Sequence, residues 1–329
     1  MGQYAALVSL LLTAWGISGC SAETESGGPD PVRVAACICH IGEASTRTSM
    51  SGSKASFTPG DTIGLFETLT GRSDVPYTLK GASWSTSTPA YWRDGVSTHT
   101  FYAYYPYKSA YSGMRISIPV LSGQTIASQP DPKSDLLVAG PLSQTRSASV
   151  GLTFTHGFAL LQLNVKMGIL NLLNPYNLNR ITVRGGNTAG SANRYGIVNT
   201  TGAPAQVGYD LAARSIQAAT NDAQSYAQSF YSDITGINLT TTAVTLYAFL
   251  LPGTYANPQP AISFRLSLLG ITYNTGFSNF SNTTFQAGMK YVYDVSIGLL
   301  TRSSGPDVTL VAQETVPRDG AISYHAKTI

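Results

Sequence analysis

Hydrophobic and polar residues alternate along most of this chain, and the alternation is clearest in residues 150–165. There Leu152 and Phe154 are separated by polar or small residues. Successive side chains of a β-strand point to opposite faces, so this period of two predicts a strand with one buried face. At residues 160–161 the hydrophobic positions change phase. Either a bulge turns the strand there, or the chain passes from one hydrophobic core to the next.

Similar short segments recur along the chain and are separated by Gly, Pro, Asn and Ser residues. This spacing of strands and turns is typical of a β-sandwich. Strands are expected at residues 62–66, 100–105, 115–120, 135–139, 180–184, 194–199, 244–251, 261–269, 290–297, 307–312 and 321–329. Residues 220–234 differ, because their apolar residues follow helical spacing behind a polar start, which predicts a short helix.

Composition supports an all-β class. The chain has 329 residues, of which 43% are hydrophobic and 11% charged, which is typical of one large or two ordinary folded domains. Its 19 Tyr residues suit half-buried pleated surfaces. The net charge of +3 comes from scattered Lys and Arg residues, so the basic patch of a nucleic-acid-binding protein is missing and no nucleic-acid partner is expected.

The N-terminus has the form of an export signal. In residues 1–19 an apolar run too short to span a bilayer is followed by small residues, as in a signal peptide. The sequence I-S-G-C that ends at Cys20 resembles a bacterial lipobox, so we expect acylation of Cys20, for example by palmitate. The alternative is an ordinary signal peptide whose cleavage site contains Cys. If Cys20 is acylated, residues 20–31 are expected to form a lipid-anchored tether to the membrane.

The first predicted strand, residues 32–41, is apolar on both faces. A strand of this kind needs cover on both sides, so we expect it to lie in a long apolar groove. It is followed at once by the polar, Gly-rich residues 42–56, which contain Arg47 and are expected to be accessible. One face of the strand carries Val32, Val34, Ala36 and Ile38.

Candidate chemistry is sparse, and no catalytic residue, cofactor or metal site is predicted. Cys37 and Cys39 stand two apart, where a disulfide would be strained, and His40 alone does not complete a metal site. Ser51 and Lys54 have the S-x-x-K spacing of some nucleophilic hydrolases. That spacing works only on a helix, and the nearby Gly and Pro residues indicate a loop.

Two further features each have a structural and a functional interpretation. His156 lies on an apolar strand face, where a histidine is usually a hydrogen-bonded core residue; a solvent-open His156 lined by carboxylates would instead favour an enzyme. The aromatic group Trp84, Tyr91 and Trp92 could stack on sugars, but aromatic residues of a sandwich are usually part of its core.

Several short motifs together resemble the fimbrillin-like family of Bacteroides-type pilus subunits. Each is weak alone, but their order covers most of the chain. After the lipobox and the first strand they are Thr46-Arg47-Thr48, Phe57-x-x-Gly60-Asp61-x-Ile63-Gly64-Leu65-Phe66, Phe101-Tyr102-Ala103-Tyr104-Tyr105-Pro106-Tyr107, Ser134-Asp135-Leu136-Leu137-Val138-Ala139, Leu152-Thr153-Phe154-Thr155-His156 and Phe285-x-Ala287-Gly288-x-x-Tyr291-x-Tyr293.

The resemblance implies two tandem transthyretin-like β-sandwich domains, residues 32–168 and 169–329, in a lipoprotein of the outer membrane and cell surface. It also implies assembly by strand exchange. In that family an Arg-specific protease cuts after the first strand, that strand leaves, and a terminal strand of another pilus subunit takes its place. By position Arg47 matches the cut site, Arg33 is the second choice, and residues 321–329 are a candidate donor.

Two functions from different classes follow. The first is a structural and adhesive pilus subunit whose partners are other subunits, the protease, the membrane and host or bacterial surface ligands. The second is a cell-surface glycan-binding lipoprotein that never polymerises. They differ in whether residues 32–41 form a removable strand, since a glycan-binding module needs none.

Overall fold

The computed structural model describes residues 29–38, 50–51, 54–55, 57–108, 111, 113–120, 135–168, 176–184, 205–217, 228–230, 237–254, 261–277, 284–301 and 305–318. These residues form β-strands joined by turns, which confirms the predicted all-β class. Within the described ranges there is no helix long and apolar enough to cross a membrane.

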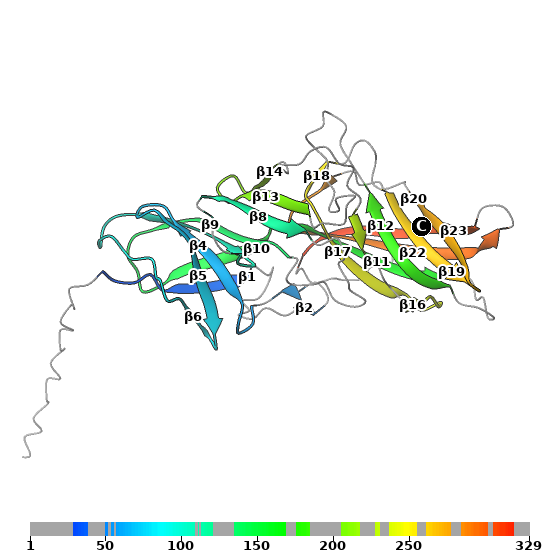
Figure 1. The fold of residues 1–329 in the computed structure, drawn as a ribbon, viewed down its shortest axis with the longest axis horizontal. Coiled ribbons are helices and arrows are strands. Elements are labelled where there is room, and N and C mark those ends of the chain that lie inside the picture. Colours follow the sequence, from blue (N-terminus) through cyan, green and yellow to red (C-terminus); the bar gives the residue numbers. More distant parts are fainter. Residues whose placement is uncertain are drawn as a thin grey trace, which may run out of the picture.

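Seven strands form one sheet, here called the N-terminal sheet, at one end of the elongated molecule (Figure 1). Their order across the sheet is β1-β10-β9-β7-β4-β5-β6, with β1 and β6 at its edges. β1 runs parallel to β10, whereas the other pairs are antiparallel. The strands are β1 (Val34–Ile38), β4 (Thr62–Glu67), β5 (Arg72–Lys80), β6 (Ser83–Ser85), β7 (His99–Tyr105), β9 (Leu137–Gln144) and β10 (Val150–His156).

The N-terminal sheet curls until its two edges approach each other. The amide of Val32, before β1, donates to the carbonyl of Ala90, beyond β6, at 2.8 Å. The amide of Trp92 donates back to the carbonyl of Asp30 at 3.0 Å. The curled sheet encloses a hydrophobic core to which all seven strands contribute. β1 therefore lies along the seam where the sheet meets itself.

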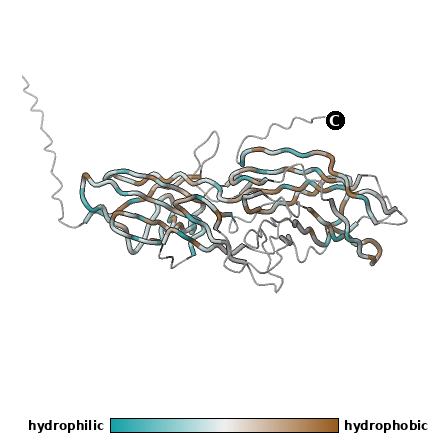
Figure 2. The backbone as a smooth tube through the Cα atoms, turned by 90° about the horizontal axis from the view of Figure 1, so that it is seen from above, coloured by the Kyte–Doolittle hydropathy of each residue, from teal (hydrophilic) through white to brown (hydrophobic). Residues whose placement is uncertain are grey.

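The other end of the molecule is a sandwich of two sheets, here called the C-terminal sandwich (Figures 1 and 2). One sheet has the order β17-β11-β22-β23; the other has the order β15-β12-β19-β20, with β16 also paired to β12. These strands are β11 (Ala159–Met167), β12 (Asn177–Arg184), β15 (Gln228–Phe230), β16 (Ile237–Asn238), β17 (Val244–Leu250), β19 (Ala261–Leu268), β20 (Ile271–Phe277), β22 (Met289–Thr301) and β23 (Gly305–Pro317).

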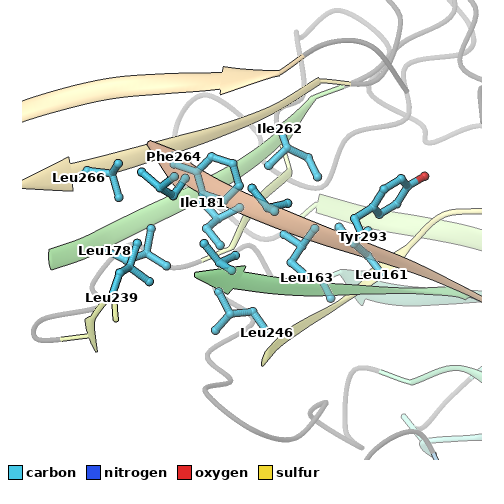
Figure 3. Packing of buried hydrophobic residues seen from close by; sticks show 14 of the residues in the cluster. Leu161, Leu163, Leu178, Ile181, Leu239, Leu246, Ile262, Phe264, Leu266 and Tyr293 are labelled. Atoms are coloured by element: carbon cyan, nitrogen blue, oxygen red, sulfur yellow. The ribbon is translucent and has the colours of Figure 1, made fainter. Parts of the chain in front are cut away.

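Side chains from the two sheets of the C-terminal sandwich pack against each other in one core. Leu161 and Leu163 of β11 point toward Phe264 of β19 and Ile181 of β12 (Figure 3). All four are at most 2% exposed, so the two sheets exclude water between them. Burial of this kind is the main favourable term in folding such a sandwich.

The change of phase near residue 160 marks the passage from one core to the other. β10 ends at His156 and places Leu152 and Phe154 in the core of the N-terminal sheet. β11 begins at Ala159 and places Leu161 in the core of the C-terminal sandwich. Of the two alternatives that the pattern left open, the passage between cores is therefore confirmed.

The pairing of β11 indicates where the N-terminal sheet ends along the chain and the C-terminal sandwich begins. β11 pairs with β17 and with β22, so by its hydrogen bonds it belongs to the C-terminal sandwich. The domain boundary predicted after residue 168 stays a prediction, while the pairing favours a division at residues 157–158.

A small third sheet joins the two parts. In it β13 (Ala205–Asp210) pairs with β8 (Arg115–Val120) on one side and with β14 (Ser215–Gln217) on the other. β13 comes late in the sequence, yet it covers the outer face of the N-terminal sheet. A hydrophobic cluster at this place, here called the junction cluster, draws residues from both parts of the molecule. Its buried members are Phe66, Tyr104, Ile116, Leu136, Val138, Phe158, Leu160, Tyr209, Leu211, Tyr247, Phe249 and Leu251.

The helix predicted at residues 220–234 is wrong where the structure describes it. Gln228–Phe230 forms β15, which pairs with β12 in the register Ile181↔Phe230. Hydrogen-bonding partners on a neighbouring strand outweigh a weak helical pattern, because propensity is a small term beside tertiary contacts. The other residues of this segment, and the strands predicted at 194–199 and 321–329, lie outside the described residues.

Gly64 of β4 provides a test of the packing. A Cβ atom added there would lie 2.5 Å from Asp74 Oδ1 and would also clash with the ring of Tyr104. Tyr104 cannot easily move, because its hydroxyl donates to Asp74 at 2.8 Å in a buried site. We expect Gly64→Ala to lower the free energy of unfolding by about 1–3 kcal/mol, as overpacked cores do.

The matched control is Gly151→Ala in β10, where an added Cβ atom meets nothing within 4 Å. We expect that variant to be as stable as the wild type or slightly more stable, since Ala has less backbone entropy to lose. Urea denaturation followed by tryptophan fluorescence measures both variants. Equal midpoints for the two would contradict the packing described for Gly64.

Candidate functional site

The predicted removable strand is an edge strand of the N-terminal sheet. β1 pairs on one side, with β10, in the register Val34↔Val150 to Ile38↔Phe154 (Figure 1). An edge strand can leave without breaking the hydrogen bonds between the other strands, whereas a central strand cannot. Its position is therefore compatible with removal.

One face of β1 is buried, and the side chain of Val32, two residues before the strand, is buried with it. Val32, Val34 and Ile38 are 2%, 7% and 1% exposed and belong to the core of the N-terminal sheet, and Ala36 packs beside them. On the opposite face Ala35 is exposed. The expectation that both faces are covered is therefore wrong. The small residues of the outer face leave little apolar surface in water, so a one-sided edge position is tolerated.

Burial is the main force that holds this segment in place. Each fully buried Val or Ile contributes about 1.5–3 kcal/mol, so three of them together contribute roughly 5–9 kcal/mol before chain entropy is subtracted. That sum is of the order of the net stability of a whole domain. β1 is therefore stable at its edge, and its loss would need compensation by an equivalent strand.

Polar contacts fix the register of the segment. The Tyr77 hydroxyl donates to the carbonyl of Val32 at 2.9 Å inside the core. Burial raises the pKa of Tyr77 to about 12, so the hydroxyl keeps its proton and remains a donor at neutral pH. The amide of Val150 donates to the carbonyl of Arg33 at 2.8 Å. These bonds act on backbone carbonyls, so they do not require particular side chains in the strand they hold.

Charge adds little to the attachment. Asp30 accepts from Arg146 Nε at 3.0 Å, but both side chains are more than one third exposed. Exposed ion pairs typically contribute less than about 1 kcal/mol. Within the described residues β1 itself carries no charged side chain, because its sequence is Val-Ala-Ala-Cys-Ile.

The predicted cleavage and lipidation residues differ in what the structure describes. Arg33 is exposed between the buried Val32 and Val34, and its carbonyl is engaged by β10. Arg47 and Cys20 lie outside the described residues, so their roles stay predictions.

The S-x-x-K spacing lies in a hairpin and not on a helix. Ser51 of β2 (Met50–Ser51) pairs with Lys54 of β3 (Lys54–Ala55) in an antiparallel register. These residues are therefore not in a helix, as expected, but they form strands and not the predicted loop.

His156 is buried beside a carboxylate and an arginine. Its Nδ1 lies 2.8 Å from Asp135 Oδ2, and Arg318 donates to both oxygens of Asp135 at 2.9 and 2.8 Å. Burial alone would raise the pKa of Asp135, but the positive charge of Arg318 and the contacts with His156 outweigh burial and hold that pKa at about 2. A carboxylate lines His156, yet at 6% exposure the ring is closed to solvent, so the core interpretation holds.

The aromatic residues mostly belong to the core. Trp92 is 3% exposed, and its ring packs edge-on against His99 at 4.9 Å between ring centroids. Trp84 packs edge-on against the buried Phe57 at 5.2 Å. Trp92 therefore cannot stack on a sugar in solution, whereas Trp84 and Tyr91 are partly exposed. Among the residues that the structure describes, no group of three or more His, Cys, Asp or Glu side chains could hold a metal ion.

Two buried polar contacts between side chains were not predicted from the sequence patterns. His99 Nδ1 lies 2.9 Å from Glu67 Oε1, with both side chains fully buried, and Arg318 pairs with Asp135 as described. The partners are 32 and 183 residues apart in the chain. No local spacing connects them, so only the fold brings them together.

Comparison with known proteins identifies the family of this chain. The model of the family described as fimbrillin-like matches residues 46–310. The chain is 38% identical over 119 residues to a Bacteroides ovatus protein provisionally named fimbrium tip subunit Fim1C, a match that covers 33% of this chain and 22% of that protein. The chain therefore spans about a fifth of the length of this relative.

Solved structures share the fold at low sequence identity. A fimbrial protein from Bacteroides vulgatus matches with a TM-score of 0.54 and 14% identity, over 87% of this chain and 99% of that one. A protein from Bacteroides ovatus, provisionally named a cell adhesion protein, matches with a TM-score of 0.54 and 15% identity, over 90% and 100% of the two chains. Since the family model covers most of the sequence, this chain belongs to the fimbrillin-like family.

Proposed function

We propose that this protein is a structural and adhesive subunit of a surface fimbria, and that it joins other subunits by exchanging its first strand. The observation that carries the proposal is the place of β1. It is a parallel edge strand that covers one side of a hydrophobic core and is held by burial and backbone hydrogen bonds, without a buried charge. The family to which the chain belongs supports the same role.

Removal of β1 would turn β10 into an open receptor. The backbone of β10 would lose its partners from Val34 to Ile38, and the core residues Leu152 and Phe154 would lose their cover. Unpaired strand edges beside apolar surface bind extended segments of other chains by β-strand addition. The incoming strand would need an apolar residue at every second position, in place of Val32, Val34 and Ile38.

Residues 321–329 of another copy are a candidate donor. Their sequence A-I-S-Y-H-A-K-T-I alternates larger or apolar residues with polar ones, which is the period that the groove demands. This segment lies outside the described residues, so the proposal for it comes from its sequence alone.

Cleavage after Arg47 by an Arg-specific protease would release the first strand. Arg47 is preferred to Arg33, because the Arg33 carbonyl already accepts a hydrogen bond from β10 and its neighbours on both sides are buried. A protease must bind its substrate in an extended form, so a site within a paired segment is cut slowly.

Before cleavage the protein would be held at the outer membrane by lipid on Cys20, with the tether of residues 20–31 between the anchor and the fold. Each buried CH₂ group of an acyl chain contributes about 0.8 kcal/mol, so two or more chains hold a protein firmly. No enzymatic activity is proposed. The rival function, glycan binding without polymerisation, has less support, because Trp92 is buried in the core and Trp84 is partly buried against it.

The protease test separates the fimbrial function from its rival. Incubation of the purified protein with an Arg-specific protease is expected to remove residues up to Arg47 and to produce a ladder of oligomers in a denaturing gel without boiling. Arg47→Ala should remain monomeric, because its first strand stays in place. The control is Arg93→Ala, at an exposed position outside the first strand, which should assemble like the wild type. Equal assembly by Arg47→Ala and the wild type would rule out Arg47 as the site and leave Arg33→Ala as the next variant.

The lipid anchor is tested separately by Cys20→Ala. Without the thiol no acyl chain can be attached, so we expect the variant to leave the membrane fraction or to keep its signal peptide unprocessed. Membrane fractionation and mass spectrometry of the N-terminus measure these outcomes. Retention in the membrane fraction equal to the wild type would exclude lipidation at Cys20, while leaving strand exchange untouched.

A further inference from the structure

We propose that Arg318 is a clamp that locks the C-terminal sandwich onto the N-terminal sheet, so that the two parts move as one body. The clamp lies at the junction between the two parts and does not depend on how the protein assembles.

Arg318 reaches from one part of the molecule into the other. It follows β23, the edge strand of the C-terminal sandwich, and is 3% exposed. Its Nη1 and Nη2 atoms donate to the two carboxylate oxygens of Asp135, at 2.9 and 2.8 Å. Asp135 lies two residues before β9, which begins at Leu137 in the N-terminal sheet. A two-pronged contact of this kind fixes orientation as well as distance.

The surroundings make the contact hard to break. Asp135 is 2% exposed, and the Arg318 guanidinium carbon lies 5.2 Å from the centre of the Phe249 ring in β17. Phe249 belongs to the junction cluster, so water is excluded from the pair. If the two parts separated, the Arg318 guanidinium would have to be rehydrated or left unpaired, and Asp135 would keep only His156 Nδ1, 2.8 Å away, as a partner. Leaving a charged arginine unpaired in a dry site is strongly unfavourable.

A chain of backbone hydrogen bonds runs through the same place. The Arg318 amide donates to the Gly288 carbonyl at 2.8 Å, and the Gly288 amide donates to the Phe158 carbonyl at 3.0 Å. The Gly157 amide donates to the Leu136 carbonyl at 2.6 Å. Residues 157–158 are the crossover from β10 to β11, which would otherwise be a natural hinge. The clamp and these bonds together hold the crossover from both sides.

A second contact, on another side of the junction, also holds the two parts together. Arg214, in the turn between β13 and β14, donates through Nη1 to the Gly140 carbonyl of β9 at 3.0 Å. This contact ties a late segment of the chain to the N-terminal sheet, but it is exposed and therefore weaker than the buried clamp. Arg318 is thus the contact on which rigidity of the junction should depend most.

Amide hydrogen exchange of the full chain tests the clamp. In Arg318→Met, which keeps the bulk of the side chain and loses the charge, we expect exchange at Gly157 and Gly288 to become at least tenfold faster. Reference amides are those of Leu79, which donates to Asp61, and Leu239, which donates to Tyr176, each at 2.8 Å within one part of the molecule. We expect these to change less than threefold. The matched control is Arg146→Met, an exposed arginine paired with Asp30, which should leave all four amides unchanged.

Each other result overturns the clamp. Equal acceleration at all four amides would mean that Arg318 only adds to overall stability, and no acceleration would mean that the junction is held without it. If Arg318→Met fails to fold, Arg318→Lys serves instead, since it keeps the positive charge but cannot make the two-pronged contact. We expect Arg318→Lys to speed exchange at Gly157 and Gly288 alone, and wild-type rates in that variant would equally overturn the proposal.

Discussion

The pairing of β1 with β10 is the interaction on which the architecture of the N-terminal sheet depends. Buried backbone amides and carbonyls of a strand need partners, and the inner face of β10 needs apolar cover. β1 meets both needs with five residues and one buried face. The sheet curls so that its edges meet beside this strand, which closes the core. Any segment that leaves this place must be replaced by one with the same backbone and the same alternation.

The two ends of the described chain are held by different forces. The N-terminal strand is held by apolar burial, by hydrogen bonds to its backbone and by one exposed ion pair between Asp30 and Arg146. The C-terminal strand ends in the buried pair of Arg318 and Asp135. Apolar burial and backbone hydrogen bonds can be formed by any strand of suitable hydrophobic pattern, whereas a buried charged side chain needs one particular partner of opposite charge. If the first strand is exchanged as proposed, the buried pair at the other end would leave the rest of the subunit in the same arrangement.

Tyrosine residues of the N-terminal sheet both fill its core and donate hydrogen bonds inside it. The ring of Tyr77 fills the core while its hydroxyl donates to the Val32 carbonyl, and the hydroxyls of Tyr104 and Tyr105 donate to Asp74 and Asp61. Burial raises the pKa of Tyr104 as it does that of Tyr77, so both remain donors. A curled sheet leaves carbonyls and turn carboxylates near apolar side chains, and tyrosine is the residue that can meet both kinds of neighbour. This accounts for part of the high tyrosine content.

Much of the local structure of this protein could be predicted from its sequence. Side-chain alternation identified β10, β11, β19 and β22, because periodicity reports directly which side chains face a core. The change of phase at residue 160 marked a change of environment but could not distinguish a bulge from a passage between cores. The tertiary structure decided the rest. In the folded protein β1 is an edge strand with one buried face, and β13 pairs with β8. Gln228–Phe230 is a strand although the spacing of its apolar residues predicted a helix. The fold also brings Arg318 to Asp135 across 183 residues. Such pairings depend on which distant segments complete a sheet or neutralise a buried charge, and no local pattern in the chain carries that information.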